Sequence, residues 1–294
     1  MPDTPRRLSI EDFEQVKSLT QTVWEGNDYV PESFPKWVND PNATTLGIFN
    51  GNELVAMLNL ERVEDTSIAW VQGLRVKDGY RDKGYGTRLT KAIVEIARKV
   101  GIRTLWYATS SKNGASQHVA ENAGFSLIES NGYFKLQNPY PDHAKPSPSI
   151  VPLQIDGNRL HEILVTNPDL IDSTVFPIAW EYDFKSLEGI NRITKNCIIK
   201  VVIDEVGRAE GIYFMATRKR KDELTAAYTV YALNRSIFVD IISRTIDEAT
   251  RLKADRAIYF LGPRGTEWAS SLGFIDEEFR DRKFLLYEFN PAVN

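Results

Sequence analysis

The stretch that decides the fold reads Gly73-Leu74-Arg75-Val76 and then, after a short interval, Arg81-Asp82-Lys83-Gly84-Tyr85-Gly86-Thr87. An apolar strand pattern ends at the first segment, and an amphipathic helix opens at the second. A glycine-containing turn between a strand and a helix directs backbone N–H groups at one point, where partial positive charge accumulates. The turn therefore predicts a pyrophosphate site, although a tight strand-to-helix connection without a ligand would use the same residue types.

Outward from this turn, the first half of the chain predicts a mainly antiparallel sheet with one crossover helix. Asn50-Gly51 suits a hairpin turn between strands at 44–49 and 53–60, and a second hairpin joins 55–63 to 68–76. A helix ending at Gly101, a strand at 104–109 and a helix at 116–123 follow, and 125–136 is expected to form a final strand pair. This order predicts an α/β (α+β) fold in which helices flank the sheet.

The second half of the chain repeats this ending. Ile93–Tyr107 aligns without a gap to Ile246–Phe260, and each copy continues to a Gly-Phe pair, at 124–125 and 273–274. Five prolines between Asn138 and Leu153 resist both helix and central strand. We therefore predict two similar domains, at 1–138 and 153–294, joined by a proline-rich linker at 139–152.

Composition excludes several classes of protein. The 294 residues, 42% hydrophobic and 26% charged, suit a folded chain of two domains, and a net charge of −4 gives no electrostatic footprint for nucleic acid. No apolar run approaches the roughly 18 residues of a membrane span, and the first residues lack a signal-peptide core. One cysteine, Cys197, and three scattered histidines predict no metal site. We expect a cytoplasmic monomer or homodimer without nucleic-acid or membrane partners, with Cys197 as a buried small hydrophobe.

The pattern Arg81-x-x-Gly84-x-Gly86 resembles the acetyl-CoA pyrophosphate loop of the GNAT superfamily of acyl-CoA-dependent N-acyltransferases. Asn113, Ser116 and the Ala123–Phe125 ending resemble the next helix of that family. The likeness covers about residues 7–136, and its helix-strand-helix part recurs in the second half. It implies two GNAT-like domains, each a mainly antiparallel mixed sheet flanked by helices, and acetyl-CoA as co-substrate.

The resemblance also implies which residues hold the CoA. The backbone of two strand residues should bond the pantetheine arm, the N–H groups of the turn should hold the pyrophosphate, and Asn113 should contact the CoA chain. The implied set is Leu74, Val76, Arg81, Lys83, Gly84, Tyr85, Gly86, Thr87 and Asn113. At the equivalent point of the second half, Tyr231–Val239 contains no glycine, so the second domain is expected to be degenerate and to bind no CoA.

The sequence departs from the family at both usual catalytic positions. Ala120 stands where many members carry a tyrosine general acid, and Trp70 stands where some members carry a glutamate general base. The usual acid and the usual base are therefore both absent, so the CoA loop supports a cofactor site without fixing the catalytic residues.

Strand geometry suggests a substitute base. If the second hairpin turns at Asp65-Thr66, Glu61 lies across from Trp70 and Asn59 lies across from Gln72, all on one face. Glu61 could then draw a proton from an ammonium acceptor, and Asn59 and Gln72 would border that acceptor. The alternative is that Glu61 is a solvated strand residue near a hairpin end.

The segment from Trp24 to Pro41 resembles the corresponding segment of histidine N-acetyltransferases, and in GNAT folds this region lines the acceptor pocket. Asp28 could pair with a substrate ammonium, and Trp24 and Tyr29 could form walls. The alternative is that Asp28 caps a helix while both aromatic side chains pack in the core.

These observations predict an N-acetyltransferase that moves an acetyl group from acetyl-CoA to the primary amine of a small molecule, with an amino acid as one candidate. The amine would attack the thioester directly in a ternary complex. Two alternatives stay open: a non-catalytic acyl-CoA-binding sensor or scaffold, and a protein N-acetyltransferase. Incubation with acetyl-CoA and a panel of amines would separate them.

Overall fold

The computed structural model describes residues 4–291, without the side chains of residues 24 and 25. The chain forms two compact units. The first comprises Met1–Thr109, Asn113–Ile128 and Leu286–Asn294, and the second comprises Ser110–Lys112 and Glu129–Leu285. These units differ from the predicted ranges 1–138 and 153–294 at both ends, because 129–138 joins the second unit and 286–294 joins the first.

The first unit contains a sheet with strand order β1-β2-β3-β4-β5. Its pairs are antiparallel except for β4 and β5, which run parallel and are connected through α3. Its elements are β1 (Arg6–Arg7), η1 (Ile10–Asp12), α1 (Phe13–Thr20), η2 (Val23–Gly26), α2 (Val30–Asn39), β2 (Ala43–Asn50), β3 (Glu53–Arg62), β4 (Ile68–Val76), α3 (Tyr85–Lys99), β5 (Thr104–Ser110) and α4 (Gly114–Asn122).

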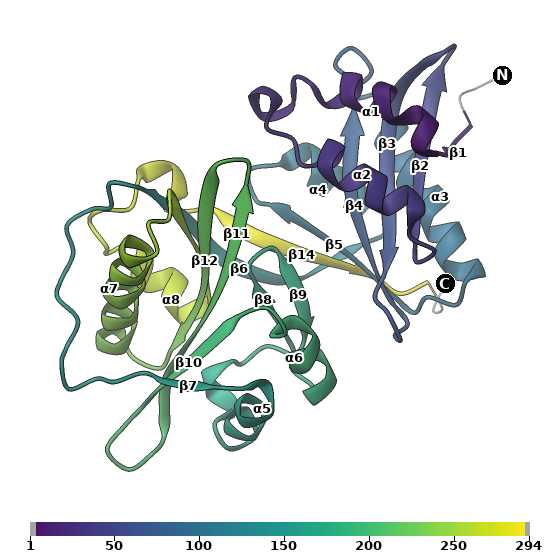
Figure 1. Ribbon diagram of the computed structural model, residues 1–294. Helices are drawn as coiled ribbons and strands as arrows, with labels where there is room; N and C mark the ends of the chain where they lie inside the picture. Colours follow the sequence, from purple (N-terminus) through teal and green to yellow (C-terminus); the bar gives the residue numbers. More distant parts are fainter. Residues whose placement is uncertain (1–3, 292–294) are drawn as a thin grey trace. The chain divides into compact units, whose positions relative to one another are not determined.

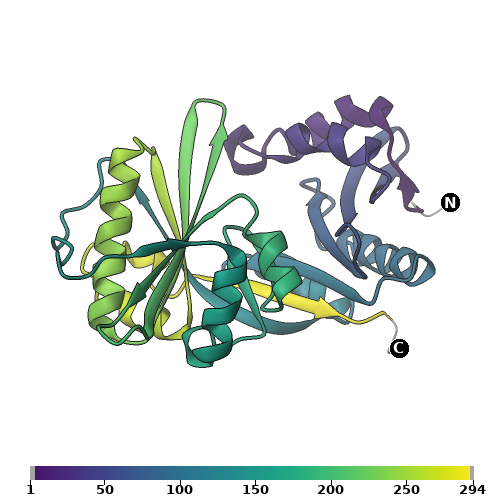
Figure 2. The same cartoon turned by 60° about the horizontal axis from the view of Figure 1, so that its bottom comes forward.

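Helices cover both faces of this sheet. Figure 1 shows α1 and α2 in front of β2–β4 and α3 behind them, and Figure 2 separates the three layers. Val16, Phe34 and Trp37 of the first two helices pack on Leu54 and Met57 of β3. Apolar positions at helical spacing on α3, such as Leu89 and Ile93, fill the opposite face.

The last strand of the chain ends in the first unit. β14 (Lys283–Phe289) crosses from the second unit into the first at Leu286. Tyr287 donates its hydroxyl to Glu121 of α4 at 3.1 Å, and the Phe289 ring lies 5.4 Å from that of Phe125. The expected strand pair at 125–136 is wrong, because that segment is one continuous strand, β6 (Ser126–Gln137).

The second unit has strand order β6-β13-β12-β11-β10-β7, with β8 and β9 as a separate pair. As in the first unit, an antiparallel hairpin, β11–β12, precedes a crossover helix and a parallel strand. Its elements are β7 (Leu153–Ile155), α5 (Gly157–Thr166), η3 (Pro168–Leu170), β8 (Val175–Ile178), β9 (Glu181–Phe184), α6 (Leu187–Ile193), β10 (Ile198–Ile203), β11 (Ala209–Arg220), β12 (Glu223–Ala232), α7 (Arg235–Arg251), β13 (Arg256–Leu261), α8 (Pro263–Ala269) and η4 (Glu277–Phe279). The predicted fold class and the repeated architecture are thus confirmed.

The proline-rich segment 139–152 contains neither helix nor strand, as its composition predicts. It nevertheless packs against the second unit. Tyr140 donates its hydroxyl to the carbonyl of Ala254 at 2.8 Å, and the Ser147 N–H donates to Asp240 of α7 at 2.6 Å. The segment is therefore a fixed strap along α7 rather than a free spacer.

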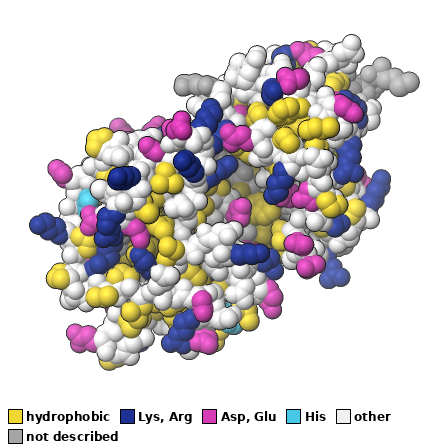
Figure 3. Space-filling view, in the orientation of Figure 1, with side chains coloured by type: hydrophobic (Ala, Val, Ile, Leu, Met, Phe, Trp, Pro, Cys, Tyr) yellow, Lys and Arg dark blue, Asp and Glu magenta, His cyan; other side chains and the backbone are white. Residues whose placement is uncertain are grey.

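Acidic and basic side chains are interspersed on the face that Figure 3 shows, in keeping with the small net charge.

The core of the second unit, between α7 and the sheet, contains several tyrosines. Tyr228 is fully buried, and its hydroxyl has no hydrogen-bond partner among the described residues. Burial raises the pKa of Tyr228 far above the ordinary tyrosine value.

We expect Tyr228→Phe to be neutral or stabilising at pH 7, by up to about 2 kcal/mol, because it removes a buried hydroxyl without a partner. Tyr259→Phe is the matched control. Its hydroxyl accepts a hydrogen bond from Thr245 at 3.2 Å, so this variant should lose about 1 kcal/mol. Denaturant unfolding of both variants measures the difference, and a clear loss in Tyr228→Phe would contradict the burial argument.

Tyr228 should also make the stability of the fold depend on pH in the alkaline range. Because the folded pKa is raised, its contribution to stability is complete below about pH 10 and falls as pH rises, by about 1.4 kcal/mol per pH unit for one proton. Tyr228→Phe should therefore lose less stability than wild type between pH 10 and 11.

Candidate functional site

The parallel strands β4 and β5 separate after a short pairing. Ile68, Ala69 and Trp70 pair with Thr104, Leu105 and Trp106, and the ladder ends there, although β4 continues to Val76. An opening between two central strands leaves room for an extended ligand with strand-like hydrogen bonds. It lies beside the turn that the sequence singles out.

A β-bulge directs this separation. Asn59 pairs with Gln72 and Met57 with Arg75, so two residues of β4, including Gly73, oppose one residue of β3. Gly73 has a φ of +70°, and a Cβ there would lie 2.8 Å from the Trp37 ring. Both the backbone conformation and the close approach of α2 require glycine at this position.

Beyond the bulge, alternate residues of β4 face the opening. Lys77 donates its N–H to Val55 of β3 at 2.8 Å, and Arg75 opposes Met57. Leu74 and Val76 therefore direct their backbone groups away from β3. The Leu74 carbonyl accepts from Arg75 Nη1 at 2.8 Å, so a pantetheine arm would meet the Leu74 N–H rather than its carbonyl.

The predicted phosphate loop is exposed and ends at the first turn of α3. Arg81, Lys83 and Gly84 are solvent-exposed, and Gly84 caps the helix with a φ of +77°. A Cβ at Gly84 would meet no atom within 4 Å, so the space over this backbone is open. The first turn of α3 carries no acidic side chain, which leaves the helix dipole available to an anion. The loop therefore fits a pyrophosphate.

Gly86 serves a different purpose from Gly84. It is buried, and a Cβ there would lie 3.0 Å from Val119 of α4. Glycine at this position allows α3 and α4 to pack closely, so its role is distinct from that of the exposed Gly84. Tyr85 and Thr87 lie in the same first turn, where N–H groups have no partner within the helix.

Asn113 is exposed and caps α4. Its side-chain oxygen accepts from the Ser116 N–H at 3.1 Å, a role that explains the residue without a ligand. The predicted contact of Asn113 with CoA remains a proposal.

The predicted register between β3 and β4 is confirmed. Glu61 lies across from Trp70, and Asn59 lies across from Gln72. Gln72 Nε2 donates to Glu61 Oε2 at 2.5 Å, and Lys36 of α2 lies 3.6 Å from Glu61 Oε1. The Glu61 side chain is 26% exposed, so it is partly withdrawn from water yet accessible.

Asp28 has a partner within the chain. Arg75 donates Nε and Nη2 to its two carboxylate oxygens, both at 2.6 Å, and both side chains are largely buried. Asp28 Oδ1 also accepts from the Val30 N–H at the start of α2. Tyr29 is half-buried, lies against Trp37 and receives the Arg75 guanidinium over its ring. Asp28 and Arg75 thus form a buried ion pair beside the start of α2. The side chain of Trp24 lies outside the described residues.

Tyr107 is a polar residue of the opening that sequence reasoning missed. It follows Trp106, the last residue of β5 that pairs with β4, and its hydroxyl lies 2.7 Å from Ser116 Oγ. Burial raises the pKa of Tyr107 to about 12, and Arg75 across the opening lowers it slightly. The residue stands in an apolar strand pattern and is therefore indistinguishable in sequence from a core aromatic.

The corresponding opening is closed in the second unit. β12 and β13 pair over six residues, from Thr225 to Val230, and the Gly262 N–H continues the ladder to the Val230 carbonyl. The β11–β12 register runs without a bulge. Tyr231 is buried against Gly262, where a Cβ would lie 2.4 Å from its ring. These contacts occupy the space that the first unit leaves open.

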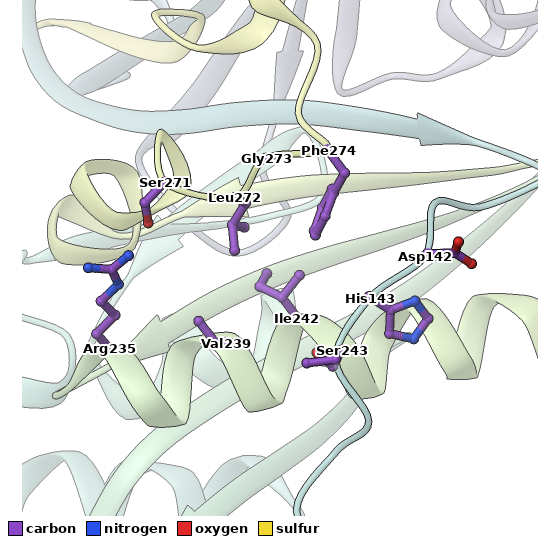
Figure 4. A pocket seen from close by; sticks show the side chains of 11 residues that line it. Asp142, His143, Arg235, Val239, Ile242, Ser243, Ser271, Leu272, Gly273 and Phe274 are labelled. Atoms are coloured by element: carbon purple, nitrogen blue, oxygen red, sulfur yellow. The ribbon is translucent and has the colours of Figure 1, made fainter.

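A hollow of about 490 Å³ lies in the second unit, and none of the predicted site residues lines it. Figure 4 shows Val239 and Ile242 of α7 facing Leu272 and Phe274, with His143 of the proline-rich segment beside them. We assign this hollow no chemistry, because none of the residues that line it belongs to the predicted site.

Cysteine and metal chemistry find no support in residues 4–291. No group of three or more His, Cys, Asp or Glu side chains there could hold a metal ion. Burial raises the pKa of the Cys197 thiol to about 12, which keeps it protonated. No helix in that range is long and apolar enough to cross a membrane.

Comparisons with known proteins agree with this geometry. Residues 10–125, which except for 110–112 lie within the first unit, match the acetyltransferase (GNAT) family model. A histidine N-acetyltransferase of Oreochromis niloticus is 27% identical over 108 residues, which span 33% of this chain and 32% of that protein. The chain thus matches about a third of the length of that curated relative.

Two solved structures share the fold along nearly the whole chain. A candidate acetyltransferase of Thermoplasma acidophilum is 18% identical with a TM-score of 0.61, and the alignment covers 98% of this chain and 99% of that one. A tandem GNAT protein from the clavulanic acid biosynthesis pathway is 14% identical with a TM-score of 0.60, and 99% of each chain is covered. Both share the fold over the two units of this chain, and the second is itself a tandem GNAT protein.

The loop assignment is tested by Gly84→Val, with Gly101→Val as a matched control. Both glycines have a φ of +77° and open space around them, at opposite ends of α3, so both variants should lose similar stability. Only Gly84→Val should lower CoA affinity, by roughly a hundredfold, because its side chain keeps the phosphate from several N–H groups. Calorimetric titration with CoA measures this, and equal affinities in the two variants would refute the site.

The closed second unit predicts a stoichiometry. We expect one CoA to bind per chain, because only the first unit has the bulge, the strand opening and the glycine turn. Titration of the full chain with CoA checks this value, and a second equivalent would show that the second unit opens.

Proposed function

We propose that the protein transfers the acetyl group of acetyl-CoA to the primary amine of a small molecule, with an amino acid as the leading acceptor class. The observation that carries this proposal is the opening between β4 and β5, which runs from the exposed phosphate loop to the face that bears Glu61. The match to the GNAT family and the likeness to histidine N-acetyltransferases support the same reaction.

The chain offers a distinct set of groups for each part of acetyl-CoA, the acetyl donor. Arg81 and the N–H groups from Lys83 to Thr87 would surround a pyrophosphate, and Leu74 and Val76 would present backbone groups to the pantetheine arm. When bound, the thioester supplies an activated acyl carbon. The strand N–H groups beside the opening can polarise its carbonyl, and the two strands hold it in place for direct attack.

Glu61 can act on the acceptor. Its Oε1 is placed beside Lys36, and its Oε2 is held by Gln72, so the carboxylate is fixed in orientation at the edge of the opening. It takes a proton from the acceptor ammonium, directly or through water, and the freed amine forms the new N–C bond while the C–S bond breaks. The proton that the nitrogen still carries in excess after the attack is released to water. Tyr107 keeps its hydroxyl proton at neutral pH and can donate it to the departing sulfur.

A non-catalytic acyl-CoA-binding module is the second candidate. It is favoured by Ala120, which is fully buried and offers no proton at the position where many family members carry a tyrosine. Release of free thiol from acetyl-CoA in the presence of an amine panel separates the two, because a sensor binds CoA without releasing acetyl groups to any amine. A protein N-acetyltransferase would instead acetylate peptides and leave the small amines unchanged.

The base assignment predicts that Glu61→Gln lowers the turnover number by at least about a hundredfold while CoA affinity stays nearly constant. Glutamine preserves volume and hydrogen bonding but cannot take up a proton. Glu64→Gln, an exposed carboxylate in the turn after β3, is the control and should keep wild-type turnover.

Turnover measured against pH distinguishes proton removal by Glu61 from proton loss to bulk water. If the amine loses its proton to bulk water, Glu61→Gln and wild type should show parallel profiles of similar height, and Glu61 would have no part in the reaction. If Glu61 is the base, the low-pH limb should flatten in the variant.

A further inference from the structure

A lysine of α2 lies beside the proposed base without being hydrogen-bonded to it. Lys36 Nζ is 3.6 Å from Glu61 Oε1, which exceeds the roughly 3 Å of an N–H···O hydrogen bond. By contrast, the two contacts between Arg75 and Asp28 are both 2.6 Å long. Two opposite charges therefore lie close together at the proposed acceptor site, with room for the groups of a third molecule between their donors and acceptors.

Both side chains are accessible from solvent. The Lys36 side chain is 73% exposed, and that of Glu61 is 26% exposed. Trp70 and Gln72, which lie across from Glu61 and from its neighbour on the same face of the hairpin, are only half-buried. A small molecule can therefore reach Glu61 and Lys36 from the surface, without an internal channel.

A row of contacts connects this surface to the opening between β4 and β5. Trp70 is the last residue of β4 that pairs with β5, so Gln72 lies on the part of β4 that borders the opening. Gln72 Nε2 donates to Glu61 Oε2 at 2.5 Å, and Lys36 lies beside the other oxygen of that carboxylate. Figure 1 shows α2, which carries Lys36, in front of β3 and β4, which carry the other two residues.

Packing of α2 fixes where Lys36 leaves the helix. The next residue, Trp37, is buried against Gly73, so close that a Cβ at Gly73 would lie 2.8 Å from the Trp37 ring. Because adjacent helix residues point about 100° apart, Lys36 leaves α2 to the side of this contact. The backbone of Lys36 is therefore held in place against β4, while its ammonium group stays exposed.

We propose that Lys36 binds the carboxylate of a free α-amino acid whose ammonium group is held by Glu61. The ammonium nitrogen and a carboxylate oxygen of an α-amino acid are joined by three bonds and lie about 3 Å apart. That spacing is close to the 3.6 Å between Glu61 Oε1 and Lys36 Nζ, so one molecule meets both charges at once. The inference rests on the proposed function and adds a specificity-determining residue to it.

The charges also disfavour other amines. Glu61 alone would repel an acceptor carboxylate, and Lys36 offsets that repulsion. An alkyl amine has no anion for Lys36 to bind, and the first residue of a peptide has an amide in place of the carboxylate. We therefore expect a free amino acid to bind more tightly than an otherwise similar amine that lacks the carboxylate.

Matched pairs of L-amino acids and their C-terminal amides test the proposal on the full chain saturated with CoA. Alanine, leucine, phenylalanine, histidine and lysine span the main types of side chain, and in each pair a carboxamide replaces the carboxylate. In wild type, calorimetry should show that at least one acid binds roughly fivefold or more tightly than its amide.

Lys36→Met should lower that ratio by at least about fivefold, because it removes the ammonium group and keeps a straight side chain that suits a helix. Lys91→Met is the matched control and should keep the wild-type ratio, because it removes an exposed lysine of α3 on the other face of the sheet. An effect of Lys36 on Glu61 applies to both members of a pair, so it cancels in the ratio.

The inference would be overturned by a wild type that prefers no acid to its amide, by an unchanged ratio in Lys36→Met, or by an equal loss in Lys91→Met. Release of thiol from acetyl-CoA with the same compounds tests the proposed function separately. A preference that depends on Lys36, without acetyl transfer to any amine, would reject the acetyltransferase proposal and retain the role of Lys36. Acetyl transfer without a preference for acids would do the reverse.

Discussion

The close approach of Trp37 to the backbone of Gly73 is the constraint on which the site depends. The Trp37 ring of α2 leaves no room for a Cβ at Gly73, the bulged residue of β4. The bulge also requires a left-handed backbone conformation there, which glycine adopts easily. Because the bulge adds a residue to β4, the strand turns away from β5 soon after the Trp70–Trp106 pair. The opening, the direction of Leu74 and Val76, and the position of the glycine turn all follow from this packing.

The second unit shows what the same architecture does without that constraint. It keeps the hairpin, the crossover helix and the parallel strand, but its hairpin has no bulge and β12 stays paired with β13 for six residues. Tyr231 then fills the space beside Gly262, and its burial stabilises the closed arrangement. In the second unit, the lack of a glycine turn and the closure of the sheet thus occur together.

Local signals in the sequence predicted most of the first unit. Asn50-Gly51 and the alternating strands specify the hairpins, and register follows from turn position, so the pairing of Glu61 with Trp70 could be worked out before the structure. Contacts between distant segments could not. Asp28 and Arg75 are separated by 47 positions, and no local sequence pattern predicts the ion pair that they form. Tyr107 lies in an apolar strand pattern, so the sequence does not indicate that its hydroxyl bonds Ser116. Glycine roles were also ambiguous, since Gly84 and Gly86 look alike in sequence and face different surroundings.

The domain boundaries show why local signals are insufficient. Asn131-Gly132 resembles a turn, yet β6 continues through it because Asn131 bonds Leu261 and Tyr182, and the Gly132 N–H donates to Thr266. β6 is thereby committed to the second unit, and the first unit takes its last strand from residues 286–289 instead. A chain shortened after β6 would lack Trp106's partner Glu288 and the Phe289 ring on Phe125. The second unit therefore has a structural role of its own, because it contains the chain that leads into the strand that completes the first unit.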